Sequence, residues 1–499
     1  MKELNLTQGS VPKVLLQFAV PFLIANVLQA LYGGADLFVV GQYDDSASVA
    51  AVAIGSQVMQ TITGIILGIT TGTTVLIAIA IGAKDDRKVA FTIGSSVWLF
   101  SIVGVLLTLV MVAFHGQITE LMHTPAEAMA DTKNYILVCS AGILFIIGYN
   151  VVCGILRGLG DSKTPLYFVG LACVINIMLD FILVGYFHWG ATGAAIATVT
   201  AQGVSFGIAL WFLYRHGFHF DFSRKDIRLN RNLSKKIMVL GAPIALQDAL
   251  INVSFLIITV IVNQMGVIAS ASLGVVEKLM GFLMLPAIAL GSALASLIAL
   301  NVGAKQYKRA KQTLKYAIMI SLAFAIVVTT ICEIDGTILT RIFTNNQDVI
   351  KNGALYLKTY SIDCLLTSFL FCINGYLDGY ERTVFTMVHS LVAAFVGRIP
   401  LTLLFSKKYT VKEMNQNILS VKNASHLIGK LAKTKRFQNL KLYHYRYKVT
   451  FDMQFGAMCI EMPTKEVYVS FEGTDGYISG WREDFMFSYL FPTSAQKEA

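Results

Sequence analysis

Apolar segments of about 20 residues recur along this chain as far as residue 405, and short polar segments separate them. A helix of roughly 20 apolar residues crosses the hydrocarbon core of a bilayer. Because lipid offers no hydrogen-bond partners, each segment must satisfy its own backbone groups as a helix. The pattern predicts eleven transmembrane helices, over residues 14–40, 52–81, 91–114, 135–156, 166–188, 191–214, 236–262, 268–301, 314–339, 355–376 and 384–405.

The pattern repeats after about 221 residues. The segment that ends in Ile81-Gly82-Ala83-Lys84 has a counterpart that ends in Val302-Gly303-Ala304-Lys305, and Gly154 and Gly158 correspond to Gly375 and Gly379. A repeat of this length in a membrane protein indicates two similar helix bundles, which is an architecture of secondary transporters. We therefore predict an all-α polytopic membrane protein with two parallel-repeat lobes.

The second copy is incomplete. The sixth helix of the first copy would have its counterpart near residues 412–435, but six charged residues in that stretch exclude a transmembrane helix. Residues 406–499 have the composition of a soluble protein, with alternating strand-like runs. We expect an N-lobe of six helices (1–215), a cytoplasmic linker (216–235), a C-lobe that lacks the twelfth helix (236–405) and a small α/β segment (406–499).

Charged residues make up only 14% of the chain and hydrophobic residues 55%, which excludes an ordinary soluble domain. With the N-terminus taken as cytoplasmic, the inner loops hold 20 Lys and Arg and the outer loops hold 3, as the positive-inside rule requires. The formal net charge of +10 follows from this distribution and from the tail, so we expect no nucleic-acid partner. The seven cysteines show no spacing typical of a metal site or a disulfide framework, and we expect no cofactor.

Ionisable groups are costly inside apolar segments, where they usually face a cavity or a partner. The acidic residues in such segments are Asp36, Asp180, Asp248, Glu277 and Asp363. Asn176 stands four residues before Asp180, so the two share one helix face. A low dielectric favours the neutral form of a carboxyl group, which can then take up and release protons. With an amide oxygen beside it, the same group could ligate a hard cation such as Na⁺. The alternative to a functional role is that each of these acidic residues is a structural polar group that fixes helix packing.

Several short motifs occur in a fixed order along the chain. They are the segment around Asp36 that ends in Val39-Val40-Gly41, the loop Arg157–Pro165, and the runs Asn176–Asp180, Gly193–Thr198 and Asn301–Lys305. Together they resemble the multidrug and toxic compound extrusion (MATE) family over residues 5–405. The resemblance implies twelve helices in two lobes that alternate between inward-open and outward-open states. It also implies efflux of amphipathic, often cationic drug-like compounds in exchange for H⁺ or Na⁺.

The resemblance implies cation coupling at Asp36, Asn176 and Asp180, with Na⁺ as one candidate ion. It further implies a substrate or coupling role in the C-lobe, for which the candidates are Gln247, Asp248, Glu277 and Asp363. Gly397 and Leu401 occupy the positions equivalent to Asn176 and Asp180, which agrees with cation coupling in the N-lobe alone. We expect a monomer that spans a bacterial-type cytoplasmic membrane, with its N-terminus in the cytoplasm and the lipid bilayer around it.

The tail resembles something else. Residues 413–499 are similar to the first part of a class-3-lipase-like α/β-hydrolase, through Gln454–Ala457, Val469–Asp475 and Gly480–Phe485. In that family a Gly-Thr pair at a strand end lies near the oxyanion hole, although Glu472 stands where Arg is usual. No G-x-S-x-G motif follows before Ala499, so we expect no hydrolase activity.

Two other functions remain as alternatives. A membrane-anchored serine hydrolase would need the missing G-x-S-x-G motif. A lipid-linked precursor flippase would be favoured by basic residues facing its cavity, whereas the candidates here are mostly acidic. The loop Gly154–Lys163 does not match the P-loop pattern G-x-x-x-x-G-K-[ST], which disfavours an ATP-driven pump. We expect the protein to be a transporter and not an enzyme. Its source of energy is then expected to be an ion gradient.

Overall fold

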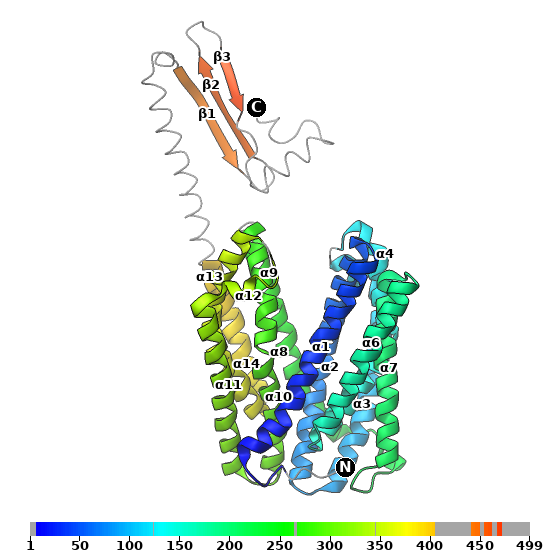
Figure 1. Ribbon diagram of the computed structural model, residues 1–499. Coiled ribbons are helices and arrows are strands. Elements are labelled where there is room, and N and C mark those ends of the chain that lie inside the picture. Colours follow the sequence, from blue (N-terminus) through cyan, green and yellow to red (C-terminus); the bar gives the residue numbers. More distant parts are fainter. Residues whose placement is uncertain are drawn as a thin grey trace. The chain divides into compact units, whose positions relative to one another are not determined.

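The computed structural model describes residues 6–122, 124–263, 267–344, 346–404, 441–449, 454–461 and 467–471. Figure 1 shows its helices and strands in chain order. The α-helices of the first copy are α1 (Val11–Tyr43), α2 (Ser46–Gly82), α3 (Asp86–Leu121), α4 (Met129–Ala141), α5 (Ile143–Gly158), α6 (Lys163–Asp180) and α7 (Gly190–His216). Those of the second are α8 (Arg231–Asn263), α9 (Val267–Leu283), α10 (Leu285–Gly303), α11 (Tyr307–Asp335), α12 (Thr337–Thr340), α13 (Gln347–Gly379) and α14 (Thr383–Val392).

Four shorter helical elements complete the helical part. Two are 3₁₀ helices, η1 (Ala126–Ala128) and η3 (Arg224–Asp226). Two are π-helical, η2 (Phe181–Tyr186) and η4 (Ala393–Arg398), and each continues an α-helix. Within the described residues, ten helical stretches are long and apolar enough to cross a membrane, or eleven if the bent pair α4 and α5 forms one span. The predicted class of all-α polytopic membrane protein is confirmed.

The helices follow the repeat that the sequence shows. α2 begins at Ser46 and α9 begins 221 residues later at Val267; α2 ends at Gly82 and α10 ends at Gly303, the same interval apart. One helix of the first copy therefore corresponds to two of the second. Conversely, the pair α4 and α5 corresponds to the continuous α13.

Two of the predicted spans are not single straight helices. The span predicted at 135–156 bends by 51° between α4 and α5, at Gly142. At this bend α7 packs closely against Gly142, because a Cβ at position 142 would lie 2.5 Å from a methyl group of Val199. The span predicted at 268–301 breaks at Met284, and Pro286 lies in the first turn of α10. Proline has no N–H to continue the helix and its ring restricts the preceding turn.

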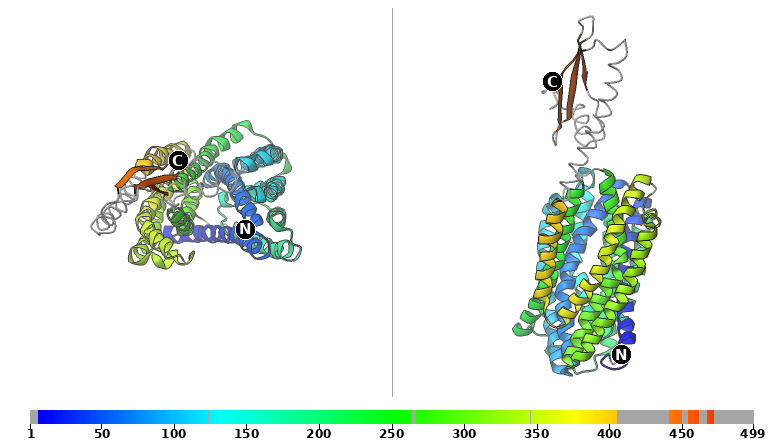
Figure 2. Two further views of the ribbon diagram at one scale, coloured as in Figure 1. Left: turned by 90° about the horizontal axis from the view of Figure 1, so that it is seen from above. Right: turned by 90° about the vertical axis from the view of Figure 1, so that its left-hand side faces the viewer.

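The helical unit, residues 6–256 and 274–398, has one large core that both lobes share. Seen end-on in Figure 2, its helices run side by side as a bundle. α1 packs against α2 and α6 of its own lobe and also against α10 and α11 of the C-lobe. α2 crosses α8 at glycines on both sides, because a Cβ at Gly72 would lie 2.6 Å from the carbonyl oxygen of Ile237, and one at Gly241 would lie 2.5 Å from Ile69 Cα. The lobes therefore contact each other backbone to backbone.

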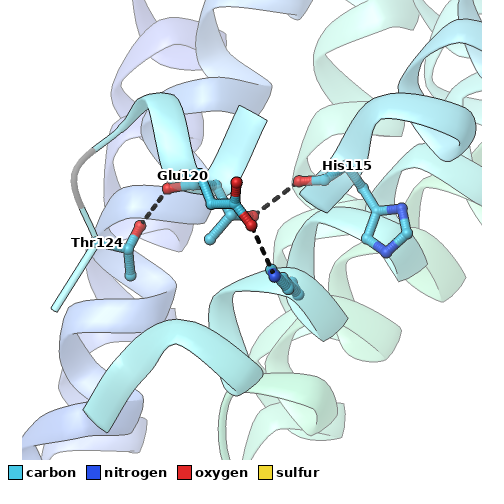
Figure 3. A network of polar contacts seen from close by, with 5 residues as sticks. His115, Glu120 and Thr124 are labelled. Atoms are coloured by element: carbon cyan, nitrogen blue, oxygen red, sulfur yellow. Dashed lines mark hydrogen bonds and ion pairs between the residues drawn. The ribbon is translucent and has the colours of Figure 1, made fainter. Parts of the chain in front are cut away.

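Polar contacts fix the connection from α3 to α4. Thr119 Oγ1 donates to the carbonyl oxygen of His115 at 2.8 Å, and Thr124 Oγ1 donates to that of Thr119 at 2.9 Å (Figure 3). An exposed ion pair of 3.3 Å joins Glu120 to Lys133 on α4. Of these contacts, the Thr124 bond joins the connecting segment to the end of α3, and the ion pair joins the end of α3 to α4.

The tail contains an antiparallel sheet of order β1-β2-β3, with β1 (Lys441–Val449), β2 (Gln454–Glu461) and β3 (Val467–Phe471). Tyr443 pairs with Cys459, and Cys459 with Val469; the register of β1 shifts between Tyr443 and Arg446. The strand-like runs expected in residues 406–499 thus include at least one strand, β3. The predicted junction at residue 406 and the predicted lack of a twelfth helix at 412–435 fall outside the described residues.

Candidate functional site

Two helices of the N-lobe bring the predicted coupling residues together. Asp36 lies on α1, and Asn176 and Asp180 lie on one face of α6. All three are buried, with exposed fractions of 3%, 1% and 0%. The α-helical part of α6 ends at Asp180 itself, where the π-helical η2 begins. Such local widening of a helix is frequent at functional sites.

Thr198 on α7 joins these residues. Its Oγ1 donates to Asp36 Oδ2 at 3.2 Å and accepts from Asn176 Nδ2 at 3.3 Å. The carboxyl groups of Asp36 and Asp180 are electrostatic neighbours. We call Asp36, Asn176, Asp180 and Thr198 the N-lobe carboxyl site.

Four oxygen atoms of this site accept no hydrogen bond from an N–H or hydroxyl group among the described residues. They are Asp36 Oδ1, Asn176 Oδ1, Asp180 Oδ1 and Asp180 Oδ2. A buried acceptor without a donor costs about 1–3 kcal/mol, and more when it is charged. Two adjacent buried carboxylates cannot both stay charged without a compensating cation. The site is therefore suited either to a proton shared by the carboxyl groups or to a hard cation ligated by these oxygens.

A second contact between α1 and α7 lies one helical turn away. Gln202 Nε2 donates to the hydroxyl oxygen of Tyr32 at 3.4 Å. Tyr32 stands four residues before Asp36, and Gln202 four residues after Thr198, so the two contacts follow the same pair of helix faces. Thr198, Gln202 and Tyr32 were not among the predicted site residues. The sequence feature that could have predicted them is the four-residue spacing from Tyr32 to Asp36 and from Thr198 to Gln202 on apolar helices.

The C-lobe candidates divide into two places. Glu277 on α9 and Asp363 on α13 are half-buried, and both act electrostatically on Tyr356. Tyr356 stacks on Tyr360 with ring centroids 5.6 Å apart, and Arg398 is a charged neighbour of Asp363. We call these five residues the C-lobe cluster. The Arg398 guanidinium lies 4.6 Å from the ring centroid of Phe255 on α8, a cation–π contact.

Asp248 is separate from that cluster. It is exposed on α8 beside the half-buried Gln247. Its charge acts on Asp378 near the end of α13, whose Oδ1 accepts a hydrogen bond of 3.0 Å from Thr386. Asp378 and Thr386 were not among the predicted residues. The functional roles of Gln247, Asp248, Glu277 and Asp363 stay predictions.

Different family models match the helical part and the tail. The sequence model of the MatE family matches residues 21–182 and 243–404, one match in each lobe. The model described as Mbeg1-like matches residues 431–499. The helical part is also similar to individual proteins and to solved structures.

Two bacterial proteins illustrate the similarity. "Probable multidrug resistance protein YpnP" of Bacillus subtilis is 29% identical over 414 residues, which cover 81% of this chain and 91% of that protein. "Multidrug export protein MepA" of Staphylococcus aureus is 26% identical over 372 residues, covering 73% and 81%. The solved structure titled "Outward-facing conformation of a multidrug resistance MATE family transporter of the MOP superfamily" has a TM-score of 0.77 at 23% identity and covers 82% of this chain and 91% of its own. A Pyrococcus furiosus MOP superfamily transporter, whose title reports a binding pocket of reverse polarity, has a TM-score of 0.76 with the same identity and coverage.

Proposed function

This chain belongs to the MatE family, and on that premise we propose that it is a secondary active transporter which exports amphipathic, cationic drug-like compounds in exchange for H⁺ or Na⁺. The observation that carries the proposal is the N-lobe carboxyl site, with its buried acidic pair and four oxygen atoms that lack donors. Such a site is stable when it holds a proton or a cation and unstable when it is empty.

Coupling follows from the position of this site between helices. Asp36 lies on α1, Asp180 at the end of α6, and Thr198 on α7. Loss of the bound cation would leave two adjacent carboxylates that repel each other, so the packing of α1 against α6 depends on occupancy. Because α1 also contacts α10 and α11, a change in its packing reaches the other lobe. An ion gradient can thereby bias the two lobes between conformations.

We place substrate recognition at the C-lobe cluster. Glu277 and Asp363 supply negative charge, and the stacked pair Tyr356 and Tyr360 supplies aromatic faces. Carboxylates and aromatic rings both attract organic cations. Arg398 offsets part of the charge of Asp363, so Glu277 is the stronger candidate for contact with a cationic substrate.

We also propose a membrane position. The excess of Lys and Arg in one set of loops supports a multi-pass protein of the cytoplasmic membrane with the N-terminus inside. We propose that it lies in the lipid bilayer as a monomer. On this orientation, the end of the bundle at which α1 begins and α2 and α10 end is the cytoplasmic end.

For the tail we propose an α/β-hydrolase-like segment, on the resemblance carried by Gln454–Ala457, Val469–Asp475 and Gly480–Phe485. The match of the helical part to a transporter family favours transport over both the hydrolase and the flippase alternatives.

The transport proposal is tested by ethidium efflux from drug-sensitive bacteria that express the full chain. Efflux driven by an ion gradient is expected, and Asp36→Asn should abolish it at unchanged membrane content, because the amide cannot bind and release a proton. Asp86→Asn, at an exposed residue in the first turn of α3, is the matched control and should retain efflux. Efflux by Asp36→Asn equal to that of the parent chain would refute the role of this carboxyl group.

A further inference from the structure

The segment Leu6–Gly9, which precedes α1, contacts both lobes at the cytoplasmic end of the bundle. Leu6 is buried, with an exposed fraction of 3%, although it lies in a polar terminal segment. Its Cδ1 packs against Gly160, where a Cβ would lie only 2.9 Å away. Gly160 has a φ of +88° and belongs to the turn between α5 and α6, so this contact is with the N-lobe.

The backbone of the same segment is held by the C-lobe. Arg309, in the first turn of α11, donates from Nη1 to the carbonyl oxygen of Gly9 at 2.8 Å. From Nη2 it donates to the carbonyl oxygens of Gln8 at 3.0 Å and Leu6 at 3.3 Å. A guanidinium group presents several donors in a rigid fork, which an ammonium group cannot reproduce. We call Leu6–Gly9 the strap.

The two lobes are in direct contact at this same end. A Cβ added at Gly82, at the end of α2, would overlap the carbonyl oxygen of Leu300 on α10. One added at Gly303, at the end of α10, would overlap the carbonyl oxygen of Ile79 on α2. Each contact is the repeat equivalent of the other, 221 residues apart. We call this paired contact the glycine seam. It can form only while the two lobes are closed at the end where α2 and α10 end.

We propose that the strap stabilises the conformation closed to the cytoplasm, and that Arg309 is the positioning residue that holds the strap in place. The lobes cannot separate at this end while Leu6 stays against Gly160 and the strap carbonyls stay on Arg309, so opening must break one set of contacts. This proposal rests on the proposed function, since it takes this end as cytoplasmic and the lobes as alternating between two states.

The test measures the distance between the lobes directly. Spin labels are attached to cysteines that replace Lys84 and Lys305, two exposed and repeat-equivalent residues after α2 and α10. The cysteines of the helical unit are all buried, and Cys459→Ser removes the one in the tail. Distances are then recorded by pulsed electron paramagnetic resonance in the full chain, reconstituted in liposomes, with and without the substitution Arg309→Ala.

Arg309→Ala is expected to raise the ratio of long to short distances at least tenfold, and Leu6→Ala should act in the same direction. Arg309→Lys should give an intermediate ratio, because it keeps the charge but not the fork. Lys308→Ala removes the same charge one residue away, at an exposed position, and should leave the ratio unchanged.

Unchanged distances in Arg309→Ala and Leu6→Ala would overturn the strap proposal, and so would an equal shift in Lys308→Ala. The proposed function is judged separately by ethidium efflux. If efflux is absent from the parent chain while Arg309→Ala still lengthens the distance, the strap stands and the transport proposal fails. If the parent chain shows efflux and Arg309→Ala leaves the distance distribution unchanged, the transport proposal stands and the strap proposal fails.

Discussion

At the scale of single residues, Thr198 is the point at which three helices meet through one hydroxyl group. Its oxygen carries one donor and two acceptor positions, and the structure uses the donor for Asp36 and an acceptor for Asn176. The hydroxyl therefore fixes which oxygen atoms of both partners stay open to a bound cation. Valine has a similar shape but offers neither bond.

We expect Thr198→Val to raise the concentration of Na⁺ that half-saturates efflux by about 10-fold or more, because the site loses the hydroxyl that orients the ligating oxygen atoms of Asp36 and Asn176, and a hydrogen bond to a charged partner is worth roughly 1.5–3 kcal/mol. Thr198→Ser keeps the hydroxyl and should stay within about 2-fold of the parent. The measurement is ethidium efflux in inverted vesicles as a function of Na⁺ concentration and pH. Equal responses of the two variants would exclude a role of this hydroxyl in cation binding.

The sequence was a good guide to the acidic residues and a poor one to their partners. Asp36, Asn176 and Asp180 are conspicuous because polar groups are rare in apolar helices, and the four-residue spacing on α6 predicts a shared face. Thr198 is not conspicuous, since threonine hydroxyls in helices commonly bond to their own backbone, as that of Thr70 does to Ile66. Leu6 gives no signal at all, because its burial depends on Gly160, which is distant in sequence.

At the scale of helices, the eleven predicted spans match the observed helices, but the breaks at Gly142 and Met284 were missed. Hydropathy averaged over a span of 20 residues reports how much apolar surface a segment has and not whether its axis is straight. Both breaks depend on packing or backbone chemistry at one residue, through Gly142 against Val199 and through Pro286 in α10.

The glycine seam yields a prediction at this scale. A methyl group at Gly82 would meet backbone rather than a movable side chain, so the lobes must part to accommodate it. Gly82→Ala is expected to shift the Lys84–Lys305 distance to longer values and to reduce efflux at least 10-fold. Gly64→Ala, in the same helix but with open space around it, should keep both readouts and add up to about 1 kcal/mol of helix stability. A short distance in Gly82→Ala would contradict this account of the seam.

At the scale of the whole molecule, the residues of both candidate sites precede residue 399, and the family match ends at residue 404. A version of the chain that ends at Phe405 should therefore show ethidium efflux within about 2-fold of the full chain at equal membrane content. Loss of efflux on removal of the tail, with the helical part still inserted, would show that residues 406–499 take part in transport.

The strap has a consequence for the order in which the protein can be made. Leu6 leaves the ribosome before α1, yet the guanidinium group that holds its carbonyl oxygen belongs to a residue 303 positions later. Until α11 has been synthesised, the strap lacks its contact with Arg309 and keeps the contact of Leu6 with the turn between α5 and α6. The first lobe must therefore insert and fold with its leading segment anchored on one side, and the cytoplasmic closure is a late event of biosynthesis rather than a property that the first lobe acquires alone.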